Sequence, residues 1–110
     1  DIYVLGDASQ QGDMPKSGFS ANSQAKVCAN AVRGSLTGSK VFPAKFSNTC
    51  WSLVHENDGI KVGATYKATA EKIAKVDGFI SATNESAELR KATYEESEGW
   101  YAGITADMFG

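Results

Sequence analysis

The segment Ile2-Tyr3-Val4-Leu5-Gly6-Asp7-Ala8-Ser9 decides how the first part of this chain is interpreted. The apolar run from Ile2 to Leu5 is typical of a strand that is buried on both faces of a parallel sheet. Gly6-Asp7 ends this strand and places a carboxylate at its carboxyl end, where open α/β sheets bind ligands. Such a strand needs neighbours, and only Asp1 precedes it in the sequence. We therefore expect either an edge strand of a small domain or a segment of a larger α/β protein.

Length and charge limit the classes of partner. The chain has 110 residues, which is the size of one domain, and a net charge of −2. This charge does not attract the phosphates of nucleic acid or an anionic membrane surface. No apolar run approaches the roughly 18 residues that a membrane-spanning helix needs. We therefore expect no nucleic-acid partner and no membrane span.

The cysteines and the histidine offer little conventional site chemistry. The sequence has two cysteines, Cys28 and Cys50, and one histidine, His55. Their spacing fits no zinc motif, so we predict no metal site. Ser-His or Cys-His catalysis would have to rely on His55 alone, and we interpret His55 as a surface residue at a strand end. The sequence leaves open whether Cys28 and Cys50 form a disulfide.

A loop and a helix follow the first strand. The loop over Ala8–Gly18 is rich in Gly, Gln and Ser. Ser17 or Ser20 can cap the start of the helix, and Gly34 and Gly38 are typical of its end. Its inner face consists of small residues. They are Ala21, Ala25, Val27, Cys28, Ala31 and Val32.

The pattern changes to β structure after Val41. Two strands are predicted, over Phe46–Val54 and Ile60–Ala68, joined by a hairpin turn at Glu56–Gly59, where Asn-Asp-Gly tolerates positive φ. Lys72–Ile80 predicts either a third strand or a strand pair that turns at Asp77-Gly78.

A final helix is predicted to begin near Ser86, where Ser-Ala-Glu-Leu resembles a capped start. We expect Gly99 to interrupt it, with Gly103 in the next turn as a second candidate. The acidic group Glu95, Glu96 and Glu98 indicates a solvated helix face. The fold class is therefore α+β: residues 1–40 form a strand, loop and helix at the end of an α/β unit, and residues 41–110 form a small antiparallel sheet with a C-terminal helix.

Four segments, taken in order, resemble a known family. They are IYVLGDAS (2–9), MPKSGFSANSQAKVCANAV (14–32), NTCWSLV (48–54) and WYAGITADMFG (100–110). Together they resemble the C-terminal portion of the flavoprotein subunit of flavocytochrome c sulfide dehydrogenase. That family is related to the sulfide:quinone reductases and to glutathione-reductase-like flavoproteins. The resemblance implies that the first strand pairs with an upstream FAD-binding region. No G-x-G-x-x-G loop occurs in these 110 residues, so FAD binding by this chain alone is left open.

The resemblance also implies a set of cofactor-binding residues. Asp7, after Gly6, matches the aspartate that binds the ribityl or pyrophosphate region of FAD. The segment from Lys16 to Ser20 matches the helix start beside the isoalloxazine ring, and Trp100 matches a tryptophan that packs near the flavin. The implied cofactor-binding residues are Gly6, Asp7, Lys16, Ser17, Gly18, Phe19 and Trp100.

Cys50 is the implied catalytic residue. It matches a cysteine that forms a redox-active disulfide with an upstream cysteine, while Cys28 is interpreted as a small buried apolar residue. Sulfide would attack the disulfide as HS⁻, and electrons would pass through flavin to a c-type cytochrome. A persistent disulfide implies a periplasmic location. In this chain alone, we expect Cys50 to be a thiol and the chain to be inactive.

Two other interpretations stay open. In the first, the C-terminal part is a non-catalytic docking or dimerisation module, and Cys50 has no redox role. In the second, the acceptor is a quinone, but the end ITADMFG is short and carries Asp107, which favours a soluble acceptor. The apolar surface of residues 2–33 further predicts self-association of the isolated chain.

Overall fold

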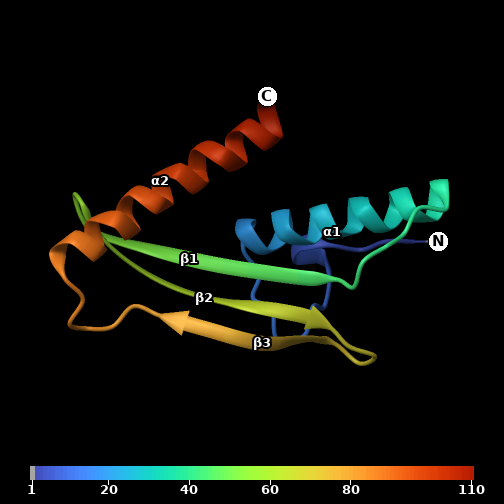
Figure 1. Cartoon of the computed structure of the whole chain (residues 1–110), viewed down its shortest axis with the longest axis horizontal. Helices are drawn as coiled ribbons and strands as arrows, with labels where there is room; N and C mark the ends of the chain where they lie inside the picture. The colour runs from blue at the N-terminus through green and yellow to red at the C-terminus, as the bar shows by residue number, and fades with distance from the viewer. Residues whose placement is uncertain (1) are drawn as a thin grey trace. The chain divides into compact units, whose positions relative to one another are not determined.

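The computed structural model describes residues 2–110 and contains two α-helices and a three-stranded sheet (Figure 1). The strand order is β1-β2-β3, and short turns join neighbouring strands, which makes the sheet antiparallel. The elements are η1 (a 3₁₀ turn, Gly6–Ala8), α1 (Gly18–Thr37), β1 (Lys45–His55), β2 (Asp58–Ala68), β3 (Ile73–Ile80) and α2 (Ala87–Phe109). The predicted α+β class, with a small antiparallel sheet and a C-terminal helix, is confirmed.

The strand predicted over Ile2–Leu5 does not occur in the sheet that residues 2–110 form. Leu5 has extended backbone angles, φ −147° and ψ 170°, but the segment has no strand assignment. Its side chains are exposed, Ile2 to 93%. An apolar run becomes a strand only where another strand supplies its backbone hydrogen bonds, and this requirement is not visible in the local sequence.

Both ends of α1 follow the predicted capping pattern. The Ser17 hydroxyl accepts a hydrogen bond from the Ser20 N–H at 3.0 Å, so Ser17 rather than Ser20 is the N-cap. Gly38 ends the helix in the left-handed conformation, and its N–H donates to the Gly34 carbonyl.

The hairpin between β1 and β2 is confirmed, with a turn at Glu56 and Asn57, where Asn57 has φ 59°. β3 is one strand, so Asp77-Gly78 is not a turn. The backbone pairs Thr69–Lys72 and Lys61–Ser81 differ in register by one residue, so one extra residue lies between Lys72 and Ser81. Within this stretch, the Gly78 N–H donates to Asp77 Oδ1 at 2.8 Å.

The last helix begins as predicted, because the Ser86 hydroxyl accepts a hydrogen bond from the Leu89 N–H at 3.2 Å. The predicted interruption at Gly99 or Gly103 is wrong, since α2 continues through both. Glycine inside a helix costs about 0.5–1 kcal/mol relative to alanine but keeps its N–H donor, so it weakens the helix without breaking it.

The chain divides into two compact units, which we describe separately. The first unit comprises Asp1–Thr49 and Gly63–Gly78, and the second comprises Cys50–Val62 and Phe79–Gly110. The predicted division between residues 40 and 41 stays a prediction. No helix within residues 2–110 combines the length and the apolar character needed to cross a membrane.

The first unit holds the buried apolar cluster of the described chain. It consists of Met14, Ala64 and Tyr66, with Phe46 and Ile73 packed against it. In the second unit, α2 lies so close to β2 that a Cβ added at Gly59 would be 3.1 Å from Tyr94 Cα. Glycine therefore fits this crossing without displacing either element.

Candidate functional site

The first unit brings together several predicted cofactor-binding residues. Gly6 is buried in η1, and Asp7 beside it is exposed. Lys16 Nζ donates to the Asp7 carbonyl oxygen at 2.5 Å, which links η1 to the segment just before α1. This contact uses the Asp7 backbone, so the carboxylate of the exposed side chain is accessible from solvent. Ser17, Gly18 and Phe19 follow in the cap and first turn of α1.

The positive charge at the start of α1 and the negative charge of Asp7 suit different groups of a ligand. The N-terminus of α1 carries a partial positive charge from the aligned peptide dipoles of a 20-residue helix. The ammonium group of Lys16 adds a full positive charge one residue before the cap. A helix start of this kind favours an electron-rich ligand atom, and the Asp7 carboxylate can accept hydrogen bonds from hydroxyl groups.

Two buried glutamine side chains hold Gly6 in place. Gln24, in α1, accepts a hydrogen bond from the Gly6 N–H at 2.7 Å and donates to Gln11 Oε1 at 2.9 Å. Gln11 in turn donates to the Pro15 carbonyl and accepts from the Ser9 hydroxyl. Gln11 and Gln24 are only 6% and 5% exposed. The loop conformation at Gly6-Asp7 is therefore fixed by buried hydrogen bonds rather than by a neighbouring strand.

Sequence reasoning missed this pair. One signal was present, because Gln24 lies between Ala21 and Ala25 on the small-residue face that was expected to point inward. A polar residue on an inward face needs a buried partner. The identity of the partner, Gln11 in the preceding loop, is a long-range contact that has no local sequence pattern.

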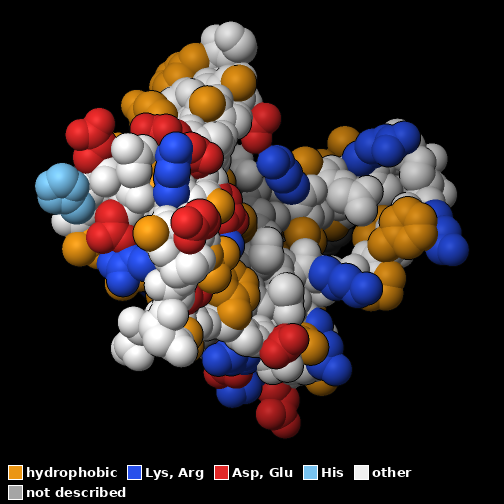
Figure 2. All heavy atoms as spheres, turned by 60° about the vertical axis from the view of Figure 1, so that its left-hand side comes forward, with side chains coloured by type: hydrophobic (Ala, Val, Ile, Leu, Met, Phe, Trp, Pro, Cys, Tyr) orange, Lys and Arg blue, Asp and Glu red, His pale blue; other side chains and the backbone are white. Residues whose placement is uncertain are grey.

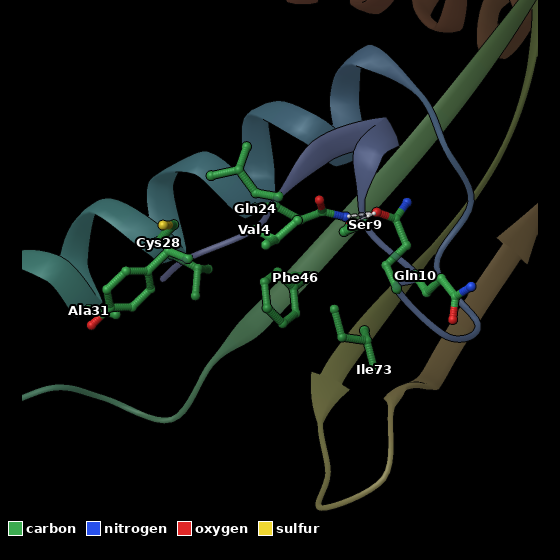
Figure 3. A pocket seen from close by; sticks show the side chains of 12 residues that line it. Val4, Ser9, Gln10, Gln24, Cys28, Ala31, Phe46 and Ile73 are labelled. Atoms are coloured by element: carbon green, nitrogen blue, oxygen red, sulfur yellow. Dashed lines mark hydrogen bonds between the residues drawn. The ribbon is translucent and has the colours of Figure 1, made fainter. Parts of the chain in front are cut away.

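A cavity with a volume of about 260 Å³ lies beside the glutamine pair in the first unit. Figure 3 shows Gln24, Cys28 and Ala31 of α1 on one side of it and Phe46 and Ile73 on the other. Cys28 is half-buried and lines this cavity. Its surroundings agree with the interpretation of Cys28 as a small apolar residue of the inner helix face.

In the second unit, Cys50 lies on β1 and is exposed. Cys28 and Cys50 are both present as thiols in the structure. Trp51, the next residue, packs against Trp100 of α2, with ring centroids 5.6 Å apart and planes inclined at 33°. Sequence analysis selected Trp100 but missed Trp51, although its position beside Cys50 in the Thr-Cys-Trp segment was a usable signal.

The second unit also carries ion pairs between α2 and β2. Lys61 Nζ lies 2.5 Å from Glu96 Oε2, and Arg90 donates to the Asp58 carboxylate. Glu96 belongs to the acidic group that was interpreted as a solvated face; Glu95, Glu96 and Glu98 are all exposed, as that interpretation requires, and Glu96 in addition pairs with Lys61. Figure 2 shows acidic and basic side chains intermixed beside the histidine, His55, which is exposed as predicted.

The predicted site residues thus fall into two groups. Cys50 and Trp100 belong to the second unit. Gly6, Asp7 and the segment Lys16–Phe19 belong to the first. Within each unit the residues are positioned as described above, and the convergence of both groups on one cofactor stays a prediction.

The model of the family described as flavocytochrome c sulphide dehydrogenase, flavin-binding, matches residues 43–109. This range begins just before β1, ends with the last residue of α2, and covers more than half of the chain. It contains both Cys50 and the Trp51–Trp100 pair. The chain therefore belongs to the flavin-binding family of flavocytochrome c sulphide dehydrogenase.

Proposed function

We propose that this chain supplies part of the flavin pocket of an FAD-dependent sulfide dehydrogenase, which passes electrons from sulfide to a c-type cytochrome in the periplasm. The observation that supports this most directly is the family match over residues 43–109, which includes Cys50 and Trp100. Membership of a flavocytochrome c family implies an oxidoreductase context and a cytochrome partner.

The donor set of the first unit fits a flavin nucleotide. The exposed Asp7 carboxylate would accept hydrogen bonds from the ribityl hydroxyls, and Lys16 with the start of α1 would face the electron-rich edge of the ring. The positive end of a helix dipole stabilises negative charge in a site with little water. Bound FAD would supply a two-electron acceptor for the reaction.

Cys50 is the proposed catalytic residue because its exposure on β1 makes its sulfur accessible to a small anion. In the oxidised enzyme, Cys50 would form a disulfide with a cysteine outside these 110 residues. HS⁻ attacks this disulfide, so a new S–S bond forms as a persulfide on one cysteine and the other leaves as a thiolate. The sulfide sulfur is oxidised by two electrons, and the disulfide is reduced by the same two electrons. These are the two electrons that bound FAD would accept.

The test compares the two cysteines. Cys50→Ser and Cys28→Ser are introduced into the complete flavin-loaded gene product, and sulfide-dependent reduction of cytochrome c is measured with the flavin content of each variant. We expect Cys50→Ser to reduce the rate to background and Cys28→Ser, the matched control, to keep it, with flavin content equal in both. Full activity in Cys50→Ser would contradict the proposed role.

One observation favours the alternative of a non-catalytic docking module. The last turns of α2 expose three large apolar side chains, Tyr101, Met108 and Phe109, to 66%, 63% and 79%. Exposed apolar groups of this kind are typical of contact surfaces. If docking were the sole role, Met108→Lys would weaken cytochrome binding, and Cys50→Ser would leave the reaction with sulfide unchanged.

A further inference from the structure

The loop residues Gly12 and Asp13 lie along the outer edge of β3, in the first unit. β3 is a terminal strand of the sheet, with β2 on one side only. The Asp13 N–H donates to the Ile73 carbonyl at 2.9 Å, and Asp13 Oδ2 accepts from the Lys75 N–H at 3.1 Å. Asp13 therefore satisfies two backbone groups of β3 that another strand would otherwise bind.

Two features hold Asp13 at this edge. Lys72 Nζ donates to Asp13 Oδ1 at 2.7 Å, and this bond, followed by the one from the Lys75 N–H, lowers the pKa of the Asp13 carboxyl below its usual value of 3.8. Gly12 has φ +70°, and a Cβ there would lie 2.6 Å from the Ile73 carbonyl oxygen. Only glycine permits so close an approach to the strand.

The β3 edge that Asp13 covers is suited to pairing with the same edge of a second copy of this chain. Ile73 and Lys75 direct their backbone groups away from β2, and by alternation along β3 so does Asp77. Val76 lies between the two charged residues and is 59% exposed. If an identical strand lies antiparallel and the two-fold axis passes through Val76, Lys75 of each copy is opposite Asp77 of the other. Opposite charges in such cross-strand pairs are favourable.

We propose that Gly12-Asp13 guards the edge of β3, and that its release lets a second copy of this chain pair antiparallel with β3, centred on Val76. The two states exclude one another, because the Lys75 N–H that bonds Asp13 is the group that the second copy must bind. The guarded chain therefore resists association through this edge, and the charge pattern determines which strand can replace the guard. This inference does not depend on the proposed flavin function.

The first experiment removes the guard and measures mass by sedimentation velocity over a range of concentrations. Asp13→Ala is compared with the parent chain and with Glu71→Gln, a matched control that neutralises an exposed acid lacking a side-chain partner in the described contacts. We expect Asp13→Ala to form a dimer at concentrations where the other two are less associated. Equal association of all three proteins would overturn the proposal.

If far-UV circular dichroism shows that Asp13→Ala does not fold, a second variant tests the same proposal. Lys72→Met removes the ion pair with Asp13 but keeps the Asp13 backbone contact. We expect the dimer fraction of Lys72→Met to rise above that of the parent chain, but by less than in a chain whose β3 edge is fully released. An unchanged dimer fraction in a folded Lys72→Met protein would contradict the guarding role.

The second experiment tests the register by oxidative cross-linking with diamide, in an Asp13→Ala, Cys28→Ser, Cys50→Ser background. In the proposed pairing the two Val76 Cα atoms form a non-hydrogen-bonded pair about 4.5 Å apart, which a disulfide can bridge. We expect Val76→Cys to cross-link faster than the control Lys75→Cys, since Lys75 is opposite Asp77 rather than its own copy. Equal rates would overturn the proposed pairing.

Discussion

In the first unit two buried, uncharged side chains, Gln11 and Gln24, join distant segments, whereas in the second unit the ion pairs that join α2 to β2 are charged and partly exposed. Gln24 connects α1 to Gly6 and Gln11 with both glutamines about 95% buried. In the second unit, the ion-paired side chains Lys61 and Glu96 are 29% and 46% exposed. Exposed ion pairs contribute about 0–1 kcal/mol, while an unsatisfied buried polar group costs about 1–3 kcal/mol. The first unit therefore depends on a few buried hydrogen bonds as well as on its apolar cluster, and the second depends on close backbone and ring packing.

The largest expected effect is at Gln24, and it tests the first half of this comparison. Gln24→Leu keeps the side-chain volume but leaves the buried Gly6 N–H without its acceptor and removes one donor to Gln11. We expect a loss of about 3 kcal/mol in the free energy of unfolding, measured with urea. The control is Gln10→Leu, the same change at an exposed position. Similar losses in both variants would mean that the buried network does not determine stability.

The next effect tests the packing of the second unit. A Cβ at Gly59 would lie 3.1 Å from the Tyr94 backbone atoms N and Cα, which a side-chain rotation cannot relieve. We expect Gly59→Ala to lower the free energy of unfolding by about 1–2 kcal/mol. The control Gly103→Ala, where no atom lies within 4 Å of the new Cβ, should instead raise it by about 0.5–1 kcal/mol. Changes of the same sign in the two variants would contradict this account.

The smallest effect sharpens the comparison, because the ion pair between Asp13 and Lys72 is an exposed, charged contact within the first unit. Its lowered pKa means that its stabilising contribution is complete above the usual value of 3.8 and is lost as the pH falls through the folded-state value. We expect Asp13→Asn to be less stable than the parent chain at pH 7, with the difference decreasing below pH 3.8. Urea unfolding at several pH values measures this difference. A difference that stays constant down to strongly acidic pH would exclude the carboxylate as its source.

The parts of the fold that were predictable have local causes. The caps at Ser17 and Ser86 and the turn at Asn57 each depend on residues within four positions of one another. The parts that were not predictable depend on distant residues. The strand at Ile2–Leu5 failed because pairing requires a partner strand, and Asp13 meets β3 some sixty residues further along the chain.

The candidate site divides in the same way. The proximity of Lys16 to Asp7 joins residues that belong to one loop, and the resemblance had already grouped them. The contact between Trp51 and Trp100 joins β1 to α2, and no pattern in either segment specifies the other. Gln11 was missed because a glutamine in a polar loop is usually solvated, and only the fold shows that it is buried.

The Trp51–Trp100 pair has a spectroscopic consequence. These are the only tryptophans of the chain, and both belong to the second unit. Indole emission will therefore report the melting of that unit alone, and the interaction between the two rings should give a near-ultraviolet dichroic band that vanishes when they separate. The first unit, which has tyrosines but no tryptophan, will be silent in this signal, so a comparison of fluorescence with backbone ellipticity can resolve whether the two halves lose their structure together.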